Sequence, residues 1–223
     1  MRASGGLACL IGVTVAGLAF ARPEGPPSAE GGVRAVHSSP VTAAPVPIAE
    51  RKVQALPRSQ PVKLTVARLK IRADVTASGQ APDGTVEVPP LTKPKAVNWY
   101  SPGPSPGETG PAVLLGHVDS RSGPAVFYKL GLMRPGDQIA VARKDGTTAR
   151  FSVEQVTTVR KDSFPTAKVY GDLTYPGLRL ITCGGTFDRV KHSYTSNTIV
   201  YARLTSTQPA GSPSPASRPA AAQ

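Results

Sequence analysis

Cysteine is scarce in this chain, which has two cysteines among 223 residues. Cys9 lies in an apolar N-terminal stretch that is typical of an export signal, so Cys183 is expected to be the one thiol of the mature form. A lone thiol cannot form an internal disulfide. In an exported protein, Cys183 is therefore either an inert buried side chain or a reactive one.

Motifs for metals, phosphates and nucleic acids are also missing. There is no Cys-x-x-Cys, no His-Glu-x-x-His and no Gly-rich phosphate loop, so we expect neither a metal nor a cofactor. The net charge is +12, but no run of Lys and Arg is longer than two, which argues against a nucleic-acid partner. The basic surface either faces anionic envelope polymers or lipid head groups, or is simply that of a soluble protein.

Long helical periodicity is absent too. Aromatic residues make up 5%, whereas 24 prolines and 22 glycines favour short strands joined by turns. The sequence predicts an all-β barrel or sandwich with only a short helix in 124–132. Strands are expected at 62–66, 85–88, 111–117, 138–143, 149–160, 178–183 and 197–204, with a two-residue turn at Asp145-Gly146 between the fourth and the fifth.

Composition divides the chain into four parts. Residues 1–21 carry Arg2, an apolar run and a small-x-small site, and are either a cleaved signal peptide or a membrane anchor. Residues 22–61 read as a Pro/Ala-rich disordered spacer, and 205–223 as a Ser/Pro/Ala tail. Residues 62–204 are then the folded domain.

His117 and Cys183 are the strongest candidates for chemistry, because each ends an expected strand and two strand ends can meet at one rim of a barrel. An imidazole beside a thiol raises its thiolate fraction or protonates a leaving amine. The alternatives are an ordinary histidine and a buried cysteine that behaves as a small hydrophobe.

Acyl transfer also needs a group that stabilises the developing oxyanion, and a guanidinium does this well. Arg179 lies four residues before Cys183, on the same face of a strand, and Arg189 lies six residues after it. Both are also ordinary candidates for surface charges. The Gly184-Gly185 pair permits unusual backbone dihedrals and close approach of a substrate, although such pairs are also common in turns.

Four segments together resemble the sortases, and within that family the class F type. They are residues 114–120 (LLGHVDS), 123–127 (GPAVF), 134–137 (RPGD) and 178–185 (LRLITCGG). The resemblance covers about 62–204. It implies a closed barrel of about eight strands with short helices in the loops.

The resemblance also implies a cysteine transpeptidase that cuts a Leu-Pro-x-Thr-Gly-like motif between Thr and Gly. Cys183 would form a thioacyl enzyme, and His117 would protonate the leaving amine and then assist the incoming one. The partners implied are surface proteins that carry a sorting motif and a cell-wall precursor amine. We further expect an extracytoplasmic monomer that contacts a membrane, if at all, through residues 1–21. The residues expected to contact the substrate are Asp119, Ser120, Arg179, Thr182, Gly184 and Asn197.

One feature departs from the family pattern, in which an arginine on the last strand follows the cysteine by roughly a dozen residues. Here that window, residues 194–197, reads YTSN. We therefore assign the oxyanion role to Arg189, with Arg179 second, and note that Asn197 offers donors without charge. Two other functions remain open: a non-catalytic module that binds the envelope, and a hydrolase without an amine acceptor.

Overall fold

The computed structural model describes residues 53–81 and 85–209. The expected signal or anchor at 1–21, with Cys9, lies outside the described residues. So do most of the expected spacer and most of the expected tail. No helix among the described residues is both long enough and apolar enough to span a membrane.

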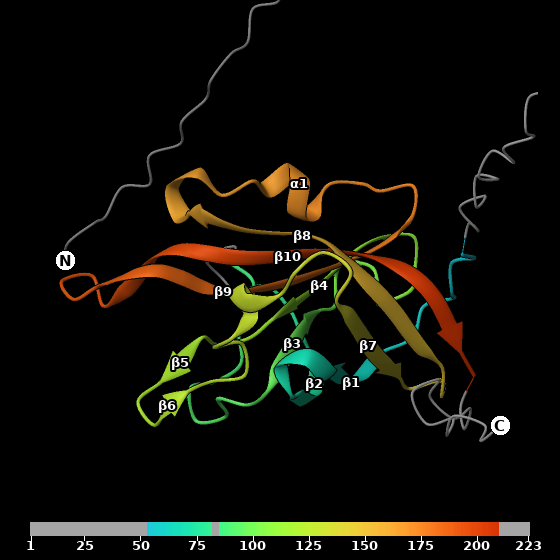
Figure 1. Ribbon diagram of the computed structural model, residues 1–223, viewed down its shortest axis with the longest axis horizontal. Helices are drawn as coiled ribbons and strands as arrows, with labels where there is room; N and C mark the ends of the chain where they lie inside the picture. The colour runs from blue at the N-terminus through green and yellow to red at the C-terminus, as the bar shows by residue number, and fades with distance from the viewer. Residues whose placement is uncertain (1–52, 82–84, 210–223) are drawn as a thin grey trace, which may run out of the picture. The chain divides into compact units, whose positions relative to one another are not determined.

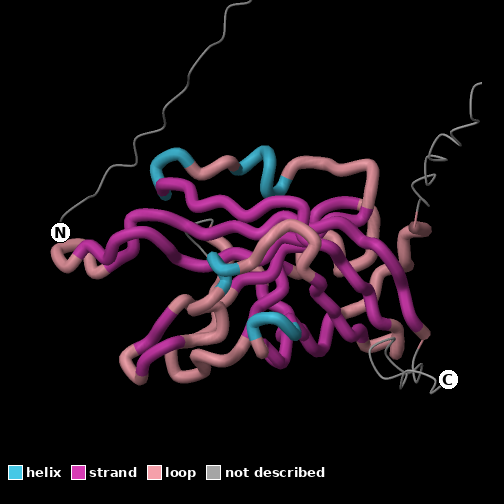
Figure 2. The backbone as a smooth tube through the Cα atoms, in the orientation of Figure 1, coloured by secondary structure: helices cyan, strands magenta, loops and turns pink. Residues whose placement is uncertain are grey.

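Eight strands form a closed barrel in the order β1-β2-β3-β4-β9-β10-β8-β7 (Figures 1 and 2). Neighbouring strands are antiparallel except for the pairs β2–β3 and β4–β9, which are parallel. The predicted all-β barrel is confirmed. The strands are β1 (Pro61–Val66), β2 (Ile71–Ser78), β3 (Val97–Tyr100), β4 (Gly110–Leu115), β7 (Gln138–Arg143), β8 (Thr148–Arg160), β9 (Pro176–Asp188) and β10 (Ser193–Gln208).

The remaining elements are short, as the absence of a long helical period predicts. A two-residue hairpin, β5 (Asp119–Ser120) with β6 (Gly123–Pro124), projects from the barrel after β4 (Figure 1). The 3-10 turns are η1 (Ala67–Leu69), η2 (Leu130–Leu132) and η3 (Lys161–Ser163), and η2 falls within the segment where a short helix is expected. Among residues 53–81 and 85–209, the single α-helix is α1 (Thr166–Tyr170), in the β8–β9 connection.

Alternation along β9 separates two apolar layers. Leu178 and Leu180 point into the barrel and join the main core. Ile181 points outward and joins a second cluster with Ile199, Val113 and Val169, the last of which comes from α1. Because side chains alternate along a strand, Cys183 shares the outward face of Ile181. The core therefore fixes which side of the barrel wall carries the thiol.

The structure moves both expected domain boundaries outward. β1 begins at Pro61 and β10 continues to Gln208, so the first four residues of the expected tail belong to a strand. The described end of the expected spacer packs on the barrel: Leu56 N donates to Gly107 O at 2.8 Å. Arg58 lies 5.2 Å above the Trp99 ring. Local composition gave no sign of these long-range contacts.

The expected strand at 85–88 is also corrected. Only Val86 pairs, in an isolated bridge with Gln80. Backbone bonds flank this bridge, from Ala81 N to Thr85 O at 2.8 Å and from Glu87 N to Gly79 O at 3.2 Å. Glu87 O also accepts hydrogen bonds from Ser78 Oγ and Asn98 Nδ2, both at 3.2 Å.

Candidate active site

The register of β4 and β9 brings His117 and Cys183 to neighbouring positions. The two strands run parallel with Leu115 opposite Ile181, and Gly116 N donates to Ile181 O at 3.2 Å. His117 lies two residues after Leu115, just past the end of β4, and Cys183 lies two residues after Ile181, within β9. Adjacent strands are about 4.8 Å apart. The register thus brings two residues far apart in sequence to the same region of the sheet.

A groove begins on that same outward face. It has a volume of about 780 Å³ and is lined by β4, β9, the β2–β3 connection and the β8–β9 connection with α1. Its lining is largely apolar and aromatic, with Val113, Leu115, Phe164, Tyr170 and Tyr100 among its residues. Such walls suit apolar side chains of an extended peptide.

Cys183 is not among the described residues that line this groove, but two of its neighbours are. Ile181, two residues earlier on the same face, lines it. Asn197, which is the β10 partner of Cys183, lines it as well. The thiol is half-buried and unpaired in any disulfide. The groove therefore extends to residues that adjoin the thiol along β9 and across to β10.

The imidazole of His117 is held by a backbone carbonyl. Its Nε2 lies 2.5 Å from Pro89 O, in the β2–β3 connection. A carbonyl oxygen only accepts, so Nε2 carries a proton in this arrangement. The contact fixes the orientation of the ring and leaves Nδ1 as its second nitrogen.

Tyr194, on β10, is a site residue that the sequence did not reveal. Its hydroxyl donates a hydrogen bond to Asp119 Oδ2. That bond, with burial and with the nearby charges of Asp119 and Cys183, raises the pKa of Tyr194 to about 12. The phenol is therefore protonated at neutral pH and lies close enough to feel the thiolate charge. Its ring packs edge-on against Phe187, with 5.2 Å between centroids.

Gly184 and Gly185 allow β9 and β10 to approach closely beyond the thiol. A Cβ on Gly184 would lie 2.5 Å from Thr198 Oγ1. Gly185 has a φ of +75°, and its Cβ would lie 2.7 Å from Ser196 Oγ. Only glycine meets both requirements without strain. The prediction that this pair adopts unusual dihedrals is confirmed for Gly185.

The two expected arginines are placed far from the thiol. Arg189 is exposed in the turn that follows the end of β9, six residues or about 20 Å of extended strand beyond Cys183. Arg179 is 3% exposed and stacks 4.7 Å from the Tyr201 ring. Burial lowers the pKa of Arg179. The cation that does line the groove is Lys161, whose Nζ donates to Ser193 Oγ at 2.8 Å.

The other residues expected to contact the substrate lie partly along the groove and partly in the barrel wall. Asp119 is engaged by Tyr194, as described above. Ser120 hydrogen-bonds within its own hairpin, to Ser122 Oγ at 2.9 Å. Thr182 is 5% exposed and alternates to the face opposite Cys183, and its buried Oγ1 has no hydrogen-bond partner among the described residues. Asn197 alone of these both lines the groove and pairs with the thiol strand at Cys183.

Solved structures show the same fold at low sequence identity. Sortase A from Corynebacterium diphtheriae is 18% identical, with a TM-score of 0.52 over 67% of this chain and 62% of that chain. Sortase C1 from Streptococcus agalactiae in complex with MTSET is 18% identical, with a TM-score of 0.50 over 66% and 69%. Sortase C1 of GBS pilus island 1 matches over 63% of its own length, so this chain spans less than two thirds of that protein.

No curated protein matches the chain at a significant level. The family model described as the sortase domain matches residues 64–205, which is more than half of the chain and contains every site residue described above. The barrel and the outward-facing thiol beside a histidine agree with that match. The chain belongs to the sortase family.

Proposed function

We propose that this protein is a class F sortase, an extracytoplasmic cysteine transpeptidase. Its substrates are surface proteins with a Leu-Pro-x-Thr-Gly-like motif, and its acceptor is a cell-wall amine. The observation that carries the proposal is the parallel register that brings His117 and Cys183 to the same region of the sheet, next to residues that line an apolar groove. Membership in a family of cysteine transpeptidases supports it, and so do the class F-like segments of the sequence.

The reaction begins when Cys183 Sγ, as the thiolate, attacks the threonine carbonyl carbon of the motif. The C–N bond to glycine breaks, and protonated His117 gives its proton to the leaving amine. An incoming amine then attacks the thioacyl carbon and loses a proton to His117, and the thiolate leaves. Atoms and charges balance, and the enzyme returns to its starting state.

Asn197 is the side chain best placed to donate to the oxyanion. It is the cross-strand neighbour of Cys183, at about 5 Å between Cβ atoms, and it lines the groove. Its carboxamide has two N–H donors. We prefer Asn197 to Arg189, which lies in an exposed turn and is not among the described residues that line the groove.

The test is a mass-spectrometric assay of the full chain with a Leu-Pro-x-Thr-Gly peptide and an amine acceptor. We expect a thioacyl adduct on Cys183 and a ligated product, both lost in Cys183→Ala while the far-UV spectrum is retained. An adduct without ligated product when several amines are offered means a hydrolase. Turnover that survives in Cys183→Ala rules out the proposed mechanism.

A non-catalytic module that binds the envelope is the second candidate, because no arginine is among the residues that line the groove. It predicts a thiol that reacts slowly with iodoacetamide and shows no dependence on His117. Fast alkylation of Cys183 that slows in His117→Ala excludes it.

A further inference from the structure

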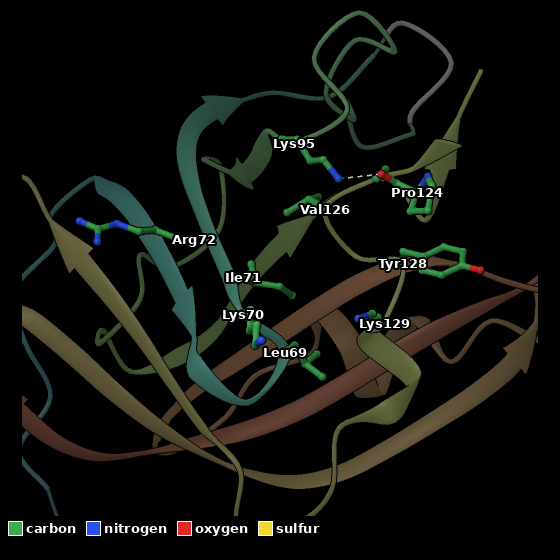
Figure 3. A pocket seen from close by; sticks show the side chains of 10 residues that line it. Leu69, Lys70, Ile71, Arg72, Lys95, Pro124, Val126, Tyr128 and Lys129 are labelled. Carbon is green, nitrogen blue, oxygen red and sulfur yellow. Dashed lines mark hydrogen bonds between the residues drawn. The ribbon is translucent and has the colours of Figure 1, made fainter. Parts of the chain in front are cut away.

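A second hollow lies beside the β5–β6 hairpin, outside the groove. It has a volume of about 300 Å³ and is lined by the β1–β2 turn, the start of β2, Lys95 and the segment 124–129 (Figure 3). Its floor is apolar, because Ile71, Ala125 and Val126 line it and are each at most 8% exposed.

Cations gather around this floor. Lys70, Lys95, Lys129 and Arg72 line the hollow, and the ten described lining residues include no aspartate or glutamate. None of the four side chains forms an ion pair with a described residue. Figure 3 shows Arg72 extending away from the others, which leaves three lysines as the charged rim.

Two of these lysines are held in place by the backbone. Lys95 Nζ donates to Pro124 O at 2.7 Å, which uses one of its three hydrogens and leaves two. Lys70 has a left-handed backbone with a φ of 56°, and its N–H donates to Ala67 O at 3.0 Å. A glycine would adopt that conformation with less strain. The Lys95 side chain and the Lys70 backbone therefore each have a defined position at the rim.

Like charges that share a small concavity repel one another, and the repulsion is relieved when an anion enters. We propose that this pocket, formed by Lys70, Lys95 and Lys129 over an Ile71–Val126 floor, binds a phosphate-type oxyanion. Lysine ammonium groups bind phosphate as point charges and need no planar fork geometry. The apolar floor accommodates the carbon atoms of a phosphate ester.

The pocket wall is joined to the catalytic segment. Phe127 N donates to His117 O at 2.9 Å, and Ala125 N donates to Val118 O at 3.0 Å. The pocket is therefore hydrogen-bonded to the segment that carries His117, and Cys183 is not among its described lining residues. The inference does not rest on the proposed transpeptidation, since it concerns binding and needs no turnover.

Lysine footprinting of the full chain tests the site. The protein is acetylated with a limiting activated ester at constant ionic strength, in sodium chloride or with rising inorganic phosphate, and modification is read residue by residue by mass spectrometry. We expect saturable protection, at least about threefold, of Lys70, Lys95 and Lys129. The exposed Lys144 and Lys191 are internal controls that lie outside the pocket.

A double variant tests whether the protection depends on the pocket lysines. In Lys70→Gln/Lys129→Gln, the phosphate concentration that half-protects Lys95 should rise about tenfold, whereas Lys144→Gln/Lys191→Gln should leave it unchanged. Protection that is equal at all lysines, or that persists in the pocket variant, overturns the proposal.

A second arm distinguishes the source of the phosphate. Vesicles of phosphatidylglycerol and phosphatidylcholine are compared with vesicles of phosphatidylcholine alone. Pocket-dependent protection by the anionic vesicles identifies a lipid head group as the ligand. Protection by inorganic phosphate without that difference supports a soluble or polymer-borne phosphate, and protection by neither probe overturns the site.

Discussion

The hydroxyl of Tyr194, on the last barrel strand, donates a hydrogen bond to the carboxylate of Asp119, two residues after His117. The bond links β10 to the β5–β6 hairpin, which follows β4. Cys183 is near enough for its charge to contribute to the raised pKa of Tyr194. Two contacts therefore flank the candidate pair: the Tyr194–Asp119 bond near Cys183, and the Pro89 carbonyl on His117.

Removing the hydroxyl of Tyr194 should abolish its hydrogen bond to Asp119. Tyr194→Phe deletes a partly buried bond to a charged acceptor, so we expect about 1 kcal/mol less stability and slower turnover. Urea unfolding at pH 7 and steady-state cleavage of a Leu-Pro-x-Thr-Gly peptide measure the two effects. Tyr128→Phe, at an exposed tyrosine, is the matched control. Equal behaviour of both variants would mean that the bond contributes nothing.

The same bond predicts a pH dependence in the alkaline range. The pKa of Tyr194 rises from 10.0 to about 12 on folding, so the folded state holds its proton more tightly than the unfolded state. Its contribution to stability is complete below pH 10 and is lost as the pH rises toward 12. Unfolding midpoints measured from pH 9 to 12 should fall less steeply in Tyr194→Phe than in the wild type.

His117 should be needed for proton transfer and not for the fold. His117→Ala is expected to lower turnover roughly 100-fold or more, with little change in the unfolding midpoint. His192→Ala is the matched control, because His192 is exposed in the turn between β9 and β10. A loss of turnover of similar size in His192→Ala would point to the hairpin and not to the imidazole of His117.

Gly185 should tolerate no side chain. Gly185→Ala forces a left-handed alanine, at about 1–2 kcal/mol, and a contact of 2.7 Å with Ser196 Oγ. Gly136→Ala carries the same kind of backbone strain in open space, since nothing lies within 4 Å of its Cβ. We expect both variants to lose stability and only Gly185→Ala to lose turnover as well. Thermal unfolding and peptide cleavage separate the two effects.

An arginine restored to the last strand should help the oxyanion. Thr195 is exposed and its Oγ1 lies 2.8 Å from the Cβ position of Gly185, so Thr195→Arg extends a guanidinium beside the thiol. We expect kcat/KM to rise on the order of tenfold, because one added donor at an oxyanion is worth that much or more. Thr195→Met controls for bulk, and an equal change in both variants would exclude a charge effect.

Local sequence patterns predict many of the barrel's strands and turns. Period-two alternation marks Leu178, Leu180 and their neighbours as a strand, and Asp145-Gly146 marks the turn between β7 and β8, where Gly146 has a φ of 83°. Helix α1 escapes notice because five residues are too few to show a period of 3.6. The packed segment 53–60 escapes notice because its contacts are with residues some 45 positions away.

The candidate site also has features that the sequence predicts and features that it does not. His117 and Cys183 can be singled out from residue type and strand-end position. Their adjacency depends on the parallel pairing of β4 with β9, which local alternation does not specify. Tyr194 is invisible for a related reason, since its partner Asp119 is 75 positions away. The preference for Arg189 rests on distance along the chain alone, whereas β9 continues to Asp188 and carries Arg189 into the turn beyond it.

Leu115 and Ile181 lie 66 positions apart and meet only when β4 pairs with β9. In an unfolded chain, nothing therefore holds Cys183 near His117. Contacts so distant in sequence form late because of the entropy lost in closing the loop. Closure of the barrel is thus the step that assembles the candidate pair, so any partly folded state that lacks the β4–β9 pairing also lacks the site.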